Sequence, residues 1–133
     1  MNRHLFSIIF FSAILLWSAC KKGAGEGGRA SIRGKIYTVN YNSTLTNPTD
    51  SGYIGGQKVY IIYGNELAVG DNQDSNSDGA YEFKYLRKGK YKVYVYTKTS
   101  PNHLDSSVVK EIEITEKKQA VELGDFKIKT NKN

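Results

Sequence analysis

The residues with the clearest metal-binding chemistry form one short polar run. Asp74, Asn76 and Asp78 alternate along the chain, and Gly79 follows them. Oxygen ligands at alternating positions, followed by a glycine that permits a sharp turn, can wrap around a Ca²⁺ ion. A complete calcium loop of this kind ends in a bidentate glutamate, and the corresponding position here is Tyr85. We therefore favour a polar hairpin loop and keep Asp74, Asn76 and Asp78 as candidate ligands for calcium, the one cofactor that the sequence suggests.

A second set of candidate binding residues is aromatic. Tyr60, Tyr94 and Tyr96 fall on the face of their expected strands opposite the residues best suited to a core. An exposed tyrosine ring can stack on a sugar, and tyrosine is favoured at protein interfaces. The outer face of a sheet also carries partly covered tyrosines that bind nothing. The pattern therefore predicts either a ligand-binding surface or an ordinary sheet face at these three positions.

The sequence offers no pattern typical of a catalytic site. His103 is the only histidine beyond the first few residues, and it follows Pro101 and Asn102 with no second histidine or cysteine near it. The serines lack the glycine-flanked context of a hydrolase nucleophile. We therefore predict no catalytic residues and a protein that is not an enzyme.

The first twenty residues have the organisation of an export signal. Arg3 supplies a positive charge, residues 5–17 are uncharged and almost wholly apolar, and Ser18 and Ala19 are small. A basic start, a short apolar stretch and a small-residue cleavage region are the parts of a secretory signal. The apolar stretch is shorter than the about 20 residues that a membrane-spanning helix needs. An ordinary secretory signal and an uncleaved membrane helix are the alternatives.

The end of this signal decides which kind it is. The segment from Leu15 to Cys20 resembles the bacterial lipobox, in which small residues precede a required cysteine, and its loose leucine position resembles lipoproteins of the Bacteroidetes type. The resemblance implies cleavage after residue 19 and lipidation of Cys20, with palmitate-type chains. Two or three acyl chains make such attachment effectively permanent, because each buried methylene contributes about 0.8 kcal/mol. Lys21 after the cysteine fits sorting to an outer membrane, facing the periplasm.

Composition is consistent with one exported β domain. Cys20 is the only cysteine, so the fold holds together without disulfides. All ten tyrosines lie after residue 19, and Val and Ile dominate the aliphatic residues there, which is strand composition. The net charge of the whole chain is +6. The lysines are spread along alternating positions, which predicts solvated sheet faces and guarded edges, and we expect no nucleic-acid partner.

Turn residues and alternation divide the chain into four parts: a signal peptide (1–19), a lipidated cysteine with a flexible Gly-rich tether (20–30), a β-sandwich (31–129) and a polar tail (130–133). Strands are expected at 31–40, 57–63, 66–69, 80–86, 90–97, 108–115 and 120–129, with a bulge at Gly124-Asp125. About seven strands without a helical period predict an all-β fold, a single antiparallel Greek-key β-sandwich.

Two of these strands show the clearest alternation. Tyr81, Phe83 and Tyr85 share one face of the strand at 80–86, with Glu82 and Lys84 on the other. Phe83 and Leu86 are expected to face inward on opposite sides of the end of this strand. In the next strand, Tyr91 starts the series of inward residues, and its hydroxyl is free to tie back to the preceding loop.

The segment from Asp78 to Val93, DGAYEFKYLRKGKYKV, resembles a family pattern. In prealbumin-like domains, which include carboxypeptidase regulatory-like and Cna B-type modules, the pattern is D-G-x-[YF]-x-F-x-x-L-x-x-G-x-Y-x-[VIL]. The resemblance extends by pattern over residues 31–129 and implies the sandwich fold. It implies little about function, because sites are grafted onto folds.

These features predict a membrane-anchored cell-envelope lipoprotein that acts as a non-enzymatic binding or structural module. A second hypothesis is a carbohydrate-binding or accessory lipoprotein of an outer-membrane nutrient uptake system, which uses the tyrosines or the loop at 40–56. A third is a small envelope enzyme or inhibitor. The expected partners are the membrane, through the lipid, and an envelope protein or a glycan.

Overall fold

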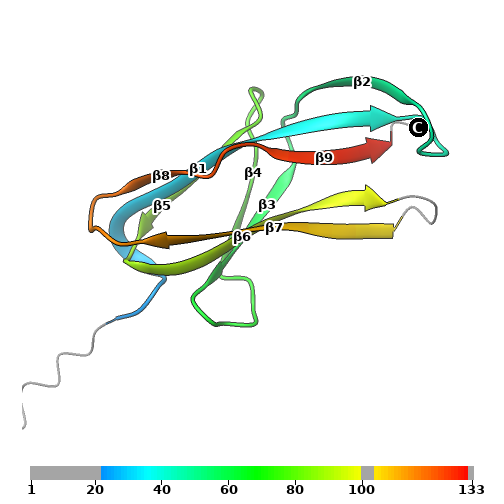
Figure 1. Cartoon of the computed structure of the whole chain (residues 1–133). Helices are drawn as coiled ribbons and strands as arrows, with labels where there is room; N and C mark the ends of the chain where they lie inside the picture. Colours follow the sequence, from blue (N-terminus) through cyan, green and yellow to red (C-terminus); the bar gives the residue numbers. More distant parts are fainter. Residues whose placement is uncertain (1–21, 100–103, 132–133) are drawn as a thin grey trace, which may run out of the picture.

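The chain folds into two β-sheets, as the computed structural model shows for residues 22–99 and 104–131 (Figure 1). These residues contain nine strands and no helix. The strands are β1 (Glu26–Tyr41), β2 (Pro48–Tyr53), β3 (Lys58–Tyr63), β4 (Asp71–Asp74), β5 (Ala80–Leu86), β6 (Gly89–Thr99), β7 (Leu104–Ile114), β8 (Ala120–Glu122) and β9 (Phe126–Asn131). The all-β prediction is confirmed, while the number of strands exceeds the expected seven. This part of the chain has no helix long and apolar enough to cross a membrane.

The first sheet is built around β1, which is long enough to pair with four other strands. Its first half pairs antiparallel with β5 and parallel with β8, and its second half pairs antiparallel with β2 and parallel with β9. Figure 1 shows β9, in red, beside the cyan end of β1. The expectation of a purely antiparallel sandwich is therefore wrong for β8 and β9. Parallel neighbours need a long crossover connection, and here the rest of the domain provides it.

The second sheet has the order β4-β3-β6-β7 with antiparallel neighbours throughout. Residues of β6 alternate between inside and outside, which places Tyr91, Val93 and Val95 in the core. Because successive side chains of a strand point to opposite faces, the residues between them face solvent. The alternation predicted for this strand is confirmed.

The hydrophobic core fills the space between the two sheets. Each sheet contributes its inward residues, and most of them are less than a tenth as exposed as in an extended chain. The fully buried members are Ile32, Ile36, Val59, Ile61, Phe83, Leu86, Tyr91, Val93, Val95, Ile114, Phe126 and Ile128. Among the described residues, the buried members of this core lie between Ala30 and Ile128.

The end of β5 departs from the predicted alternation. Tyr85 shares the alternation of the buried Tyr81 and Phe83, but its side chain is 70% exposed. Its backbone has a φ of 58°, and the register between β5 and β1 shifts at this end. A left-handed residue of this kind moves the side-chain phase by one position. Leu86 consequently takes the buried place.

Several strand boundaries also differ from expectation. The expected strand at 66–69 is a turn region, in which Leu67 is fully exposed, and the strand that follows is β4. The expected loop at 40–56 contains β2, which pairs with β1. The expected last strand is two strands, because the chain breaks at residues 123–125 and Gly124 adopts a φ of 68°. The polar tail is shorter than expected, since β9 continues to Asn131.

The described part of the expected tether is structured. β1 begins at Glu26, and Ala30 is buried. The glycines serve close packing, since a Cβ on Gly28 would lie 1.9 Å from the Leu86 carbonyl oxygen and Gly27 has a φ of 98°. Glycine tolerates both conditions because it has no Cβ. The prediction of a flexible tether up to residue 30 is therefore wrong for residues 26–30.

Tyr91 ties back through its hydroxyl to the loop before its strand, as predicted, and it also joins the residue before β1 to the core. Its ring is buried, and its hydroxyl donates to the Arg87 carbonyl at 2.6 Å. The same oxygen accepts the N–H of Gly25 at 2.9 Å, while the Arg87 N–H donates to the Gly25 carbonyl at 2.8 Å. Burial raises the pKa of Tyr91 above its ordinary value. The phenol therefore stays neutral and hydrogen-bonded. It links Gly25, just before β1, to Arg87, in the turn between β5 and β6.

Tyr81 provides a contrast that can be measured. Its hydroxyl is buried and has no hydrogen-bond partner among the described residues. A buried unsatisfied hydroxyl costs about 1–3 kcal/mol, so Tyr81→Phe should leave the Tm unchanged or raise it. Tyr91→Phe removes a buried hydroxyl that does have hydrogen-bond partners, so it should lower the Tm by about 5 °C or more. Thermal melts of the two variants check this, and equal losses would contradict the description of Tyr81.

Candidate functional site

Three predicted residues form one aromatic cluster on the outer face of the second sheet. Tyr60 on β3 is directly opposite Tyr94 on β6, and their rings stack with centroids 4.9 Å apart and planes inclined by 13°. Tyr96 lies edge-on to both, with its centroid 5.6 Å from each. The sequence placed these three residues on one face, and the structure brings their rings into contact. We call them the tyrosine cluster.

Strand geometry explains why the tyrosine cluster faces outward. Tyr60 lies between Val59 and Ile61, which are both buried, and Tyr94 lies between the buried Val93 and Val95. With a side-chain period of two, the tyrosines must occupy the other face. Aromatic pairs directly across two strands stabilise a sheet by about 0.2–1 kcal/mol. The rings are therefore held in place by the sheet before any ligand arrives.

A shallow depression of about 530 Å³ adjoins the tyrosine cluster. Tyr96 and Val109 provide its exposed apolar surface, with 43% and 49% of each residue accessible. Polar side chains stand around them, and the full lining is Ile62, Lys92, Tyr94, Tyr96, Ser107, Val109 and Glu111. The Lys92 ammonium lies 3.7 Å from the Glu111 carboxylate. An exposed pair of this kind is weak, so both groups are able to turn toward a ligand.

The protonation of Tyr94 also suits binding. Partial shielding from water raises its pKa above the ordinary value, and hydrogen bonding with Tyr96 adds to the shift. A phenol of ordinary pKa, about 10, is already protonated at neutral pH, so the shift does not change its charge there. Tyr94 can therefore donate a hydrogen bond as well as present a ring.

A second tyrosine pair lies on the first sheet, beside the segment at 40–56. Tyr37 on β1 and Tyr53 on β2 meet edge-to-face with centroids 5.4 Å apart. Their hydroxyls are used within the protein, since Tyr37 donates to Ser51 at 3.0 Å and Tyr53 to Asp125 at 2.9 Å. The hydrogen bond to Asp125 raises the pKa of Tyr53. These contacts favour a structural role for this pair.

Of the three candidate calcium ligands, Asp74 ends β4, and Asn76 and Asp78 lie in the loop between β4 and β5. The Asp74 carboxylate lies 2.9 Å from the Lys58 ammonium. The Asn76 side-chain oxygen accepts the N–H groups of Asp78 at 3.0 Å and Ala80 at 2.9 Å. Residues 22–99 and 104–131 contain no cluster of three acidic, histidine or cysteine side chains suited to a metal ion. The contacts are those of a polar hairpin loop, and calcium binding stays a prediction.

Two other predicted residues, Cys20 and His103, lie outside the residues that the structure describes. Lipidation of Cys20 is therefore still an expectation from the sequence.

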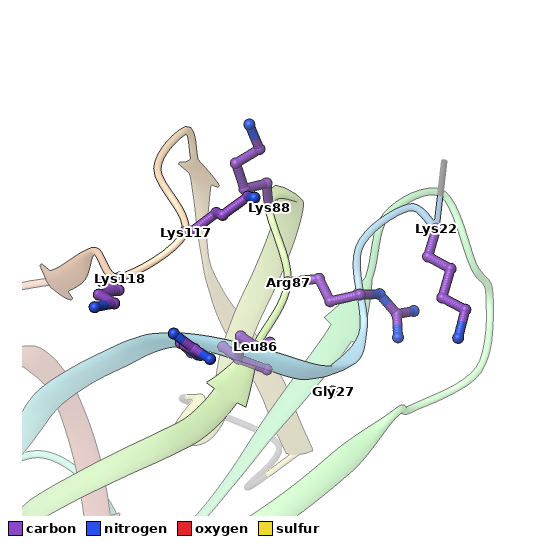
Figure 2. A pocket seen from close by; sticks show the side chains of 9 residues that line it. Lys22, Gly27, Leu86, Arg87, Lys88, Lys117 and Lys118 are labelled. Atoms are coloured by element: carbon purple, nitrogen blue, oxygen red, sulfur yellow. The ribbon is translucent and has the colours of Figure 1, made fainter. Parts of the chain in front are cut away.

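Sequence reasoning missed a cluster of cations at the end of the sandwich where β1 begins. It surrounds a depression of about 470 Å³, shown in Figure 2. Three separate segments contribute to it, and its charged members are Lys22, Arg29, Arg87, Lys88, Lys117 and Lys118. The lysines had been interpreted as spread along the chain. The signal that could have revealed the cluster is the pair of basic dipeptides, 87–88 and 117–118, each in a turn between strands.

Comparisons with known proteins give no family. No protein-family model matches the chain, and no curated protein matches it in sequence. Among solved structures, the chain is similar to "a putative carbohydrate binding protein" from Pseudomonas aeruginosa, with 12% identity, a TM-score of 0.46, and coverage of 76% of this chain and 91% of that one. It is also similar to (S)-allantoin synthase, with 9% identity and a TM-score of 0.41 over 75% of this chain and 42% of that one. Both similarities are too distant to bear on function.

The loop at 74–79 yields a prediction about metal and stability. Asn76→Ala leaves two backbone N–H groups without their acceptor and should lower the free energy of unfolding by about 1–3 kcal/mol, while Ser77→Ala, at an exposed position of the same loop, should change it little. Millimolar Ca²⁺ should leave the Tm of the unaltered protein where excess chelator leaves it. Thermal melts measure both effects, and a rise in Tm with Ca²⁺ that Asn76→Ala abolishes would make this loop a calcium site.

Proposed function

We propose that this chain is a non-enzymatic binding module, held in the cell envelope by a lipid on Cys20, and that its tyrosine cluster binds carbohydrate. One observation carries the proposal. Tyr60, Tyr94 and Tyr96 form a single preformed aromatic surface beside an open depression with polar side chains.

The chemistry of this surface matches that of a sugar. A pyranose ring has an apolar C–H face that stacks on an aromatic ring, and its hydroxyls form hydrogen bonds at the edge. Tyr96 offers an exposed ring, while Lys92, Ser107 and Glu111 provide donors and acceptors beside it. Ligand sites commonly combine apolar or aromatic lining with a few polar groups that set orientation. Because the depression is shallow and open, it suits one or two units of a longer glycan that lies across the strands.

The same surface supports binding without hydrolysis. Glycoside hydrolases use two carboxyl groups on either side of the bond that they cleave. Of the residues that line the depression, Glu111 alone carries a carboxylate, and it faces Lys92. A binding role therefore fits these residues better than the alternative of a small envelope enzyme.

The envelope location belongs to the same proposal. It is supported by the charged start, apolar stretch and small residues that precede Cys20. We place the protein at the outer membrane, facing the periplasm. There a glycan-binding surface of this size could assist nutrient uptake.

We also propose that the sandwich is prealbumin-like, with Greek-key connectivity. Support comes from the segment that carries the resemblance. Gly79 has the positive φ of a tight turn, Phe83 and Leu86 are buried, and the Tyr91 hydroxyl ties back to Arg87.

Glycan binding tests the proposed function. On a glycan array, and by calorimetry with the ligand it reveals, the mature protein should bind at least one oligosaccharide. Tyr94→Ala and Tyr96→Ala should each weaken binding about tenfold, because an aromatic stacking contact contributes about 0.5–1.5 kcal/mol beyond the buried area.

Tyr85→Asn is the matched control. Tyr85 is exposed but lies on β5 of the other sheet, and asparagine tolerates its positive φ. This variant should bind as the unaltered protein does. Unchanged binding in both cluster variants, or no glycan bound by the unaltered protein, would overturn the assignment.

A further inference from the structure

The basic cluster lies where the folded body meets the chain that leads to Cys20. Lys22 precedes β1, Arg29 is part of β1, and the remaining members belong to the turns after β5 and β7. In Figure 1 these turns and the start of β1 lie at one end of the sandwich, opposite the end of β9. We call this end, defined by Lys22, Arg29, Arg87, Lys88, Lys117 and Lys118, the basic pole.

Carboxylates do not neutralise the basic pole. The ion pairs within the described ranges involve Arg33, Lys58, Lys84, Lys92 and Lys98, and none involves a residue of the pole. The residues lining its depression include no aspartate or glutamate. Charges of one sign gathered in this way create a positive potential that attracts anions.

Arg87 fixes the pole to the start of the chain. Its guanidinium donates to the carbonyl of Gly23 at 2.7 Å and to that of Glu26. Carbonyl partners leave the positive charge intact, whereas a carboxylate would cancel it. In Figure 2 Arg87 extends toward the strand start that follows Lys22. Gly23 and Glu26 are therefore held against the pole.

The short distance between Lys22 and Cys20 indicates that the partner of the basic pole is the membrane. Lys22 is two residues after the cysteine, and two extended residues span at most about 7 Å. A lipid on Cys20 places its glycerol at the level of the membrane headgroups. The pole is then within reach of the headgroup phosphates, and the Arg87 contacts prevent the start of the domain from moving away.

We propose that the basic pole binds the phosphate groups of anionic lipids in the membrane that holds Cys20. The biological setting of this inference rests on the proposed lipid anchor. The acyl chains retain the protein, and the pole sets its orientation on the surface. Tyr94 and Tyr96 lie five to seven residues along β6 from Gly89, so the tyrosine cluster stands about 15–25 Å above the pole, at about 3.3 Å per residue. The glycan surface thereby faces sideways, clear of the headgroups.

Vesicle sedimentation of the chain from Lys21 to Asn133 tests the pole without the lipid. This chain contains every core residue of the part that the structure describes. It should bind vesicles of phosphatidylcholine mixed with anionic phosphatidylglycerol, and it should not bind phosphatidylcholine alone. Lys88, Lys117 and Lys118, all changed to Gln, should weaken binding tenfold or more, because each cation near an anionic surface contributes about 1 kcal/mol.

The matched control changes Lys35, Lys127 and Lys129 to Gln, which removes the same charge away from the pole and should weaken binding no more than about twofold. Equal losses in the two triple variants would show attraction by net charge and overturn the proposal. Failure of the unaltered chain to bind anionic vesicles would also overturn it. Displacement by millimolar inorganic phosphate at constant ionic strength would assign the pole to free phosphate instead.

The lipid anchor is measured separately, from the mass of the mature N-terminal peptide. An unmodified Cys20 would overturn the anchor while binding to anionic vesicles still supported the pole. Glycan binding is independent of both, since the pole variant retains Tyr60, Tyr94 and Tyr96 and should bind glycan normally.

Discussion

The hydrogen bonds between Gly25, Arg87 and Tyr91 determine how the rest of the molecule is arranged. A single buried phenol receives the Gly25 N–H and donates to the Arg87 carbonyl, and the Arg87 N–H closes the loop on the Gly25 carbonyl. These bonds join the first strand of one sheet to the turn that leads into the other. They also start the folded body a few residues after Cys20, where a flexible tether was expected. These hydrogen bonds fix the start of β1 relative to both candidate surfaces.

The two surfaces use different parts of the same architecture. The tyrosine cluster depends on the regular alternation of β3 and β6, which leaves the outer face of the sheet free while the inner face fills the core. The basic pole depends on turns, where side chains carry little packing role and charge is tolerated. Each surface can change without disturbing the core. One small domain can therefore attach to a membrane at its end and bind a ligand on its side.

The sequence pattern correctly predicted those features of the strands that depend on neighbouring residues. β5 has the predicted bounds, and the alternation of β6 correctly separated Tyr91 from Tyr94 and Tyr96. What failed depended on distant contacts. Tyr85 turns outward where the register between β5 and β1 shifts, and Gly28 packs closely against Leu86. β8 and β9 pair in parallel with β1, and three basic segments converge at one end of the sandwich. Both features join residues that are far apart in sequence, and periodicity carries no information about such contacts.

Hydrogen–deuterium exchange at the start of β1 in the mature protein is the most direct measurement. The amides of residues 29–33 should exchange as slowly as those in the middle of β6, and Tyr91→Phe should speed up the exchange of residues 25–30 more than that of β9. Slow exchange of these amides would show that the domain is ordered from the start of β1. Exchange of residues 25–30 at the rate of an unstructured peptide would contradict it, because a free segment there would leave the basic pole and the tyrosine cluster without a fixed orientation.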